Sequence, residues 1–142
     1  MIYETTRKNK EADREIINTL GEPFTIIERI KMKGNGCRRM IVESASHDIW
    51  DFISGHPGIH YSSIELRPKG VIIYFKHVLR DISWIIPWWQ LSVFKSSTYN
   101  IHGGGNFVKF KMDKNYLHNE KFLSRMLEMR NKYMENLSLV NN

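Results

Sequence analysis

The sequence predicts an α+β fold in which a bent antiparallel sheet, or a partly open barrel, of about seven strands is closed by a C-terminal helix and preceded by a short N-terminal helix. Several short segments carry apolar residues at every second position and are separated by Gly, Pro and Asn turns, which is typical of antiparallel strands. Near the C-terminus the period changes to three and four. The 142 residues fit a single domain.

The N-terminal helix is predicted from Ala12, Ile16 and Leu20, which lie four residues apart and so share one face. Gly21 and Pro23 follow and end it. Residues 1–23 are therefore predicted to be a helical extension of a core that spans residues 24–137.

A first hairpin is predicted from the next segment, where Phe24, Ile26, Ile30 and Met32 share one side of an alternating pattern. This pattern predicts a half-buried strand over 24–33. The turn 34–36 contains two glycines, which a tight hairpin requires, and residues 39–43 read as the returning strand.

A short helix beginning at Ser46 is predicted to connect this hairpin to the rest of the sheet, because Ile49, Trp50 and Ile53 are spaced to face inward. Further strands follow. One is predicted over 59–66 with a bulge, and the next, over 71–79, is predicted to be the central strand. Two more, over 82–86 and 89–94, lie on either side of Pro87. The last two, over 99–102 and 106–112, lie on either side of the glycines 103–105.

The closing helix is predicted from the strongest helical stripe of the sequence. Its apolar residues are Phe122, Met126, Met129, Tyr133 and Leu137. We expect Met126 and Met129 to be buried against the sheet.

The segments LRPKGVIIYFK, IIPWWQLSVF and NFVKFKM, together with this helix, resemble the bacterial pleckstrin-homology-like (PH-like) domain superfamily. The resemblance implies a bent seven-stranded barrel plugged at one end by the C-terminal helix. The helix that begins at Ser46 would then be an insertion.

The net charge of +6 favours anionic partners. The basic residues concentrate in 24–43 and 67–95, whereas 44–66 is acidic. A candidate anionic-surface site surrounds the predicted first hairpin, where the resemblance implies basic residues that grip lipid headgroups. Its members are Arg29, Lys31, Lys33, Arg38 and Arg39.

Trp88 and Trp89 are candidate interaction residues, because adjacent residues of an extended chain point to opposite faces and one of the two indoles should be exposed. Trp84 is expected in the core. The longest apolar run, 82–94, is too short and too interrupted to span a membrane.

A metal site in the His47–His60 loop is disfavoured. Pro57 and Gly58 prevent His56 and His60 from forming a helical ligand pair, although Asp48 and Asp51 lie nearby in the sequence. No metal and no cofactor is expected.

Cys37 is the only cysteine, which excludes an internal disulfide and favours a cytoplasmic protein. Arg38 and Arg39 could activate its thiol, but no second cysteine or base accompanies it.

The sequence therefore predicts a non-catalytic binding or scaffolding module that acts through protein contacts or an anionic surface, rather than an enzyme. Two alternatives stay open. One is a nucleic-acid-associated basic protein, with Lys109 and Lys111 extending the basic face, and the other is a metal-dependent enzyme that uses the His47–His60 loop.

Overall fold

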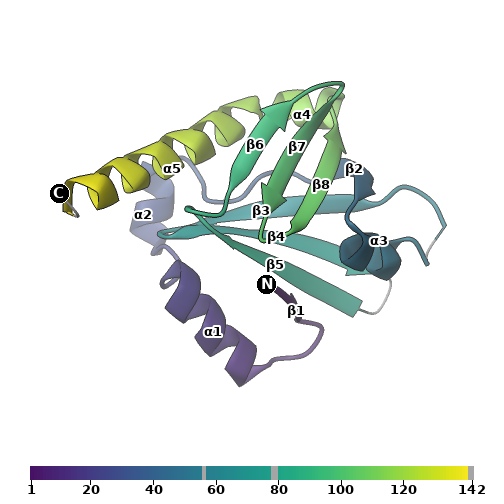
Figure 1. The fold of residues 1–142 in the computed structure, drawn as a ribbon, viewed down its shortest axis with the longest axis horizontal. Helices are drawn as coiled ribbons and strands as arrows, with labels where there is room; N and C mark the ends of the chain where they lie inside the picture. Colours follow the sequence, from purple (N-terminus) through teal and green to yellow (C-terminus); the bar gives the residue numbers. More distant parts are fainter. Residues whose placement is uncertain (56, 78–79, 141–142) are drawn as a thin grey trace.

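The computed structural model describes residues 1–55, 57–77 and 80–140 and has an α+β fold with one antiparallel sheet, which does not close into a barrel (Figure 1). The described residues form eight strands in the spatial order β1-β5-β4-β3-β2-β8-β7-β6. Their bounds are β1 Ile2–Glu4, β2 Met40–Ala45, β3 Tyr61–Arg67, β4 Gly70–His77, β5 Arg80–Pro87, β6 Ser92–Lys95, β7 Thr98–Gly103 and β8 Asn106–Lys111. The predicted antiparallel sheet and C-terminal helix are thus confirmed.

The sheet bends at β2, which belongs to both of its halves. Met40 and Ile41 pair with β3, whereas Val42 to Ala45 pair with β8, and the register shifts between Val42 and Ser44. Such irregularities increase twist and let a sheet fold over itself. Figure 1 shows the result, in which β6, β7 and β8 cross over β3, β4 and β5 at a steep angle.

The main core fills the concave side of this bend. Its largest fully buried side chains include Trp84, Trp88, Tyr99, Phe75 and Phe110. β1 adds a further strand beside β5, in a segment where the sequence predicted only a helical extension. A three-residue strand is too short to show an alternating pattern.

Helix α1 (Lys10–Leu20) covers part of the opposite, outer face of the sheet. Ile16 and Leu20 contact Ile72 of β4 and Ile85 of β5 in a second, smaller apolar cluster. Asn9 caps the helix through its side-chain oxygen, which accepts hydrogen bonds from the backbone of Glu11 and from Ala12. The prediction of this helix from its four-residue spacing is confirmed.

The predicted strand over 24–33 is wrong, because residues Ile26–Lys31 form helix α2. The predicted first hairpin therefore does not exist. Residues 34–39 lead from α2 into β2, and only an isolated bridge joins Gly36 to Glu65 of β3. The physical reason is local, since Thr25 and Glu28 form a capping box that starts a helix.

Helix α3 (His47–Ile53) follows β2 as predicted, and its Ile49 and Ile53 are buried while Trp50 is half-buried. The short helix α4 (Lys114–His118) and the long helix α5 (Glu120–Val140) close the chain. Phe122, Leu123 and Met126 of α5 are buried in the main core.

The rest of the predicted stripe on α5 is less covered than expected. Met129 and Tyr133 are only partly buried against the core, and Leu137 is exposed. The helix continues beyond the edge of the sheet, as Figure 1 shows, so its last turns have little to pack against.

Candidate functional site

Hydrogen bonds within its first turn start helix α2. The Thr25 side chain accepts a hydrogen bond from the backbone N–H of Glu28 at 3.2 Å, and the Glu28 carboxylate accepts one from the backbone N–H of Thr25 at 2.9 Å. These reciprocal bonds satisfy two backbone donors that a helix start leaves free. Lys33 and Gly34 end the segment with φ angles of 62° and 100°, respectively.

The residues on either side of the helix anchor it. Phe24 before it and Met32 after it are partly buried against the main core. The Arg125 guanidinium of α5 also donates a hydrogen bond to the backbone carbonyl of Lys33 at 3.3 Å. The helix is therefore held at both ends, while its own side chains remain available.

No residue of α2 is buried. Ile26, Ile27 and Ile30 are 68%, 67% and 72% exposed. Scattered exposed apolar residues are normal on a protein surface, but three isoleucines within five residues of one helix form a continuous apolar patch.

Basic side chains border this patch. Successive helical residues are about 100° apart around the axis, so the three isoleucines span about 100° of the circumference, with Lys31 next to them on one side and Arg29 on the other. Glu28 projects from the opposite side. We call Ile26, Ile27, Ile30, Arg29, Lys31 and Lys33 the α2 surface.

A hollow of about 670 Å³ lies between α2 and the first half of α5. Lys121 and Arg125 of α5 add two cations to Lys31 and Lys33 in its lining. Two carboxylates of α5 also line it, so its charge is mixed, although cations predominate. The basic character of the α2 surface thus continues onto the neighbouring helix.

The structure does not bring the five predicted basic residues together. Arg38 turns toward α4, where its guanidinium lies 3.5 Å from His118 and its backbone exchanges two hydrogen bonds with the Asn119 side chain. Arg39 lies over the Tyr61 ring of β3. Of the five, only Arg29, Lys31 and Lys33 stay on or directly after α2, with Arg29 on one side of the isoleucines and Lys31 on the other.

The two candidate tryptophans have different environments. Trp88 is fully buried, and its indole N–H donates a hydrogen bond to the carbonyl of Pro68 at 3.0 Å, so it is a core residue and not an interaction residue. Trp89 is 64% exposed. It borders a hollow beside Thr19 of α1 and Tyr133 of α5.

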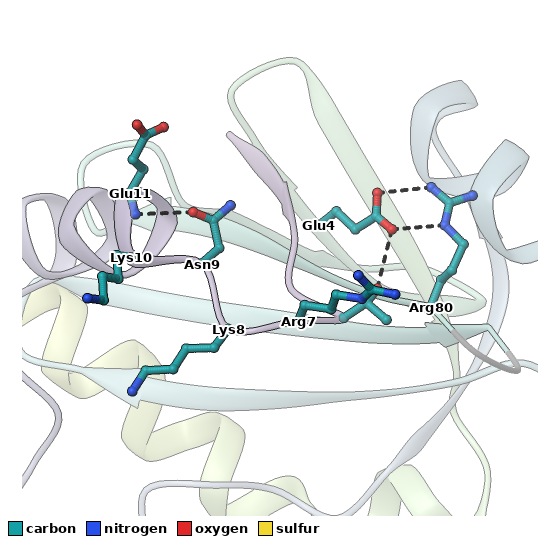
Figure 2. Close-up of a pocket in the computed structure, with 8 residues that line it drawn as sticks. Glu4, Arg7, Lys8, Asn9, Lys10, Glu11 and Arg80 are labelled. Carbon is teal, nitrogen blue, oxygen red and sulfur yellow. Dashed lines mark hydrogen bonds and ion pairs between the residues drawn. The ribbon is translucent and has the colours of Figure 1, made fainter.

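Another hollow lies at the start of α1, where Glu4, Arg7, Asn9 and Arg80 are among its lining residues (Figure 2). The Glu4 carboxylate already binds the Arg80 guanidinium through two hydrogen bonds of 3.0 and 3.1 Å. The Asn9 side chain is already used as the helix cap. The side chains of Glu4, Asn9 and Arg80 in this lining therefore already have partners within the protein.

In the segment considered for metal binding, His47 Nε2 lies 3.1 Å from an Asp51 oxygen at exposed positions of helix α3. His60 contacts the Trp50 ring edge-on. In the part of the chain that the structure describes, no three His, Cys, Asp or Glu side chains are grouped as metal ligands would be. His56 lies outside the described residues, so the complete loop is not tested.

Cys37 lies in a protected position despite its arginine neighbours. Its sulfur accepts a hydrogen bond from the backbone N–H of Ile64 at 3.1 Å. Burial raises the pKa of the thiol to about 11, because a buried thiolate would lose its hydration. Arg38 and Arg39 do not lower this pKa, so the disfavoured alternative of an activated thiol gains no support.

No protein-family model, no curated protein and no solved structure matches this chain. None of the helices in the described residues is both long enough and apolar enough to cross a bilayer. Among the described residues, the α2 surface combines three exposed isoleucines with cations that form no ion pair.

Proposed function

We propose that this chain is a non-catalytic binding module of PH-like architecture that docks on an anionic membrane surface through the α2 surface. The observation that carries the proposal is a helix that buries none of its residues and exposes three isoleucines between flanking cations. The bent antiparallel sheet with its C-terminal helix supports the PH-like part of the proposal.

An apolar face bordered by Lys and Arg is the arrangement by which helices lie in a membrane interface. The apolar side chains enter the boundary between headgroups and acyl chains, and the cations meet the phosphates. Each Lys or Arg near an acidic surface contributes about 1 kcal/mol. Arg29, Lys31 and Lys33 would together contribute about 3 kcal/mol on this scale, or roughly two powers of ten in affinity.

A nucleic acid is a less suitable partner for this surface. Proteins hold single-stranded nucleic acids by stacking bases on aromatic side chains and double-stranded ones mainly through phosphate contacts. The α2 surface has no aromatic residue, and its three exposed isoleucines would stay in water on a phosphate backbone. A protein partner would cover the isoleucines, but the flanking cations favour an acidic lipid surface.

Sedimentation with lipid vesicles tests the proposal. Vesicles of phosphatidylcholine with phosphatidylserine should bind the protein, and vesicles of phosphatidylcholine alone should bind it weakly. The variant Arg29→Glu/Lys31→Glu/Lys33→Glu should lose most of the binding to acidic vesicles. All three side chains are exposed, so its melting temperature should change little.

The matched control reverses three exposed lysines elsewhere on the surface. The variant Lys95→Glu/Lys111→Glu/Lys114→Glu has the same net charge as the first variant, because each loses three cations and gains three anions. It should retain more binding than the α2 variant. Equal losses in the two variants would mean that net charge alone attracts the protein, and this result would overturn the assignment to α2.

A further inference from the structure

The outer face of the sheet has a second feature, which is independent of α2. Helix α1 covers only part of this face, and a hollow of about 530 Å³ lies over β3 and β4. We call it the outer-face hollow. It is lined by Arg39, Ile59, His60, Tyr61, Ser62, Ser63, Tyr74 and Lys76.

Arg39 lies over the Tyr61 ring at this hollow. Its guanidinium carbon is 4.0 Å from the centre of the ring, within the range of a cation–π contact. An arginine guanidinium carries its N–H donors in a planar fork, which can bind phosphate oxygens in pairs. The contact with Tyr61 therefore holds this cation at the hollow before any ligand binds.

Lys76 supplies a second cation from β4. Neither Arg39 nor Lys76 forms an ion pair with a described residue. None of the described residues that line the hollow carries a carboxylate. The nearby Glu65 already accepts hydrogen bonds from the Tyr74 hydroxyl at 3.0 Å and from Arg67 at 2.6 Å.

Further polar groups of the lining make no hydrogen bond with a described residue. They are the hydroxyls of Tyr61 and Ser63 and the imidazole of His60. Most of these groups can donate hydrogen bonds, while Ile59 and the part of the Tyr61 side chain that Arg39 leaves uncovered add apolar surface. The lining thus matches a ligand that is anionic and rich in acceptors at one end and aromatic at the other.

We propose that the outer-face hollow binds a nucleoside phosphate, with the phosphates between Arg39 and Lys76 and the base against the apolar part of the lining. The volume lies within the range of small-molecule sites, which combine aromatic walls with a few convergent polar groups. This site and the α2 surface share no residue, so either can fail without the other.

Calorimetric titration with ATP tests the proposal, with adenosine and inorganic tripolyphosphate as probes for each half of the ligand. ATP should bind, and each half alone should bind at least about tenfold more weakly, which corresponds to 1.4 kcal/mol. The variant Arg39→Ala/Lys76→Ala should weaken ATP binding at least about tenfold. The control Lys95→Ala/Lys111→Ala removes the same charge at exposed positions elsewhere and should leave it unchanged.

Four results would overturn the assignment. The first is that ATP does not bind at concentrations up to about 1 mM. The second is that tripolyphosphate binds as tightly as ATP, and the third is that the two variants lose ATP affinity equally. The fourth is that a single-stranded oligonucleotide binds and ATP does not. Thermal melting of both variants checks folding. If Arg39→Ala/Lys76→Ala melts early, Lys76→Ala alone, at an exposed position, replaces it and should still weaken ATP binding.

Discussion

Replacing the three exposed isoleucines by serine, in the variant Ile26→Ser/Ile27→Ser/Ile30→Ser, should reduce binding to acidic vesicles without destabilising the protein. Full burial of an isoleucine side chain is worth about 2 kcal/mol. Each of these side chains is about two-thirds exposed in the free protein. Complete transfer into the membrane would therefore contribute roughly 1.3 kcal/mol per residue and roughly 4 kcal/mol in total.

A peripheral helix buries only part of its apolar face, so about half of this value, near 2 kcal/mol, is a realistic estimate. That corresponds to a loss of about thirtyfold in the partition coefficient. The loss should appear in a sedimentation titration against vesicle concentration. Because the charges of Arg29, Lys31 and Lys33 are unchanged, any remaining binding should depend more strongly on salt than that of the original protein.

Stability is the control measurement. The isoleucines make no buried contact, so the free energy of unfolding should change by no more than about 0.5 kcal/mol. Leu117→Ser at another exposed position, 59% exposed on α4, should affect neither quantity. Unchanged vesicle binding in the isoleucine variant would refute the proposed membrane contact. A large drop in its melting temperature would also refute it, because such a drop would mean that the isoleucines already pack against another part of the protein.

Three further predictions concern the core. Met126→Asp should lower the free energy of unfolding by several kcal/mol, because it places an unpaired carboxylate at a fully buried position of α5. In thermal melting, the cooperative transition of the original protein should be lost or shifted far down in temperature. Cys37 should react with a thiol reagent at pH 8 at least about a hundredfold more slowly in the native protein than in urea, because its pKa of about 11 leaves almost no thiolate, whereas an unfolded cysteine titrates near 8.5. Burial raises the pKa of Tyr99 and of Tyr74, with a smaller contribution from Glu65 at Tyr74. The contribution of these two tyrosines to the free energy of unfolding is therefore fully present below about pH 10, the ordinary pKa of tyrosine. It should be lost as the pH rises further. Tyr99→Phe should reduce that alkaline loss in a urea titration repeated at rising pH, and an unchanged pH dependence would contradict the assignment.

The strands from β3 to β8 could be predicted from the sequence because their turns are specific, although the bulge predicted in β3 is wrong, since its register with β4 is continuous from Ser62 to Arg67. Gly104 and Gly105, for example, have φ angles of 57° and 88° in the hairpin between β7 and β8, a conformation that glycine adopts at little cost. One of the adjacent Trp88 and Trp89 is exposed as expected, but both lie in the turn between β5 and β6, so strand alternation is not the reason. These features depend on residues that are close in the sequence.

Helix α2 could not be predicted from the alternation of apolar residues. Phe24, Ile26, Ile30 and Met32 fit a period of two, but the isoleucines also fit a short amphipathic helix, and an apolar run of this length does not distinguish the two. The distinguishing signal was the Thr25-x-x-Glu28 capping box, which reads as a helix start. The apolar pattern also predicted a buried face, whereas these isoleucines are exposed.

The candidate sites could be predicted only in part. Arg29, Lys31 and Lys33 belong to one local segment, so their grouping follows from the sequence once the helix is recognised. The outer-face hollow could not be predicted, because Arg39 reaches the Tyr61 ring only through the pairing of β2 with β3, and Lys76 comes from β4. Strand register at this distance is set by the whole sheet.

The most direct test of the central claim measures whether α2 itself contacts the membrane. The variant Ile30→Cys can be labelled with an environment-sensitive fluorophore, since the native Cys37 thiol is protected, and the labelled original protein serves as the background. On acidic vesicles the label at position 30 should shift its emission to the blue and increase in intensity, while the same label at Leu117→Cys should not. An unchanged spectrum at position 30, with the protein bound to the vesicles, would contradict the account.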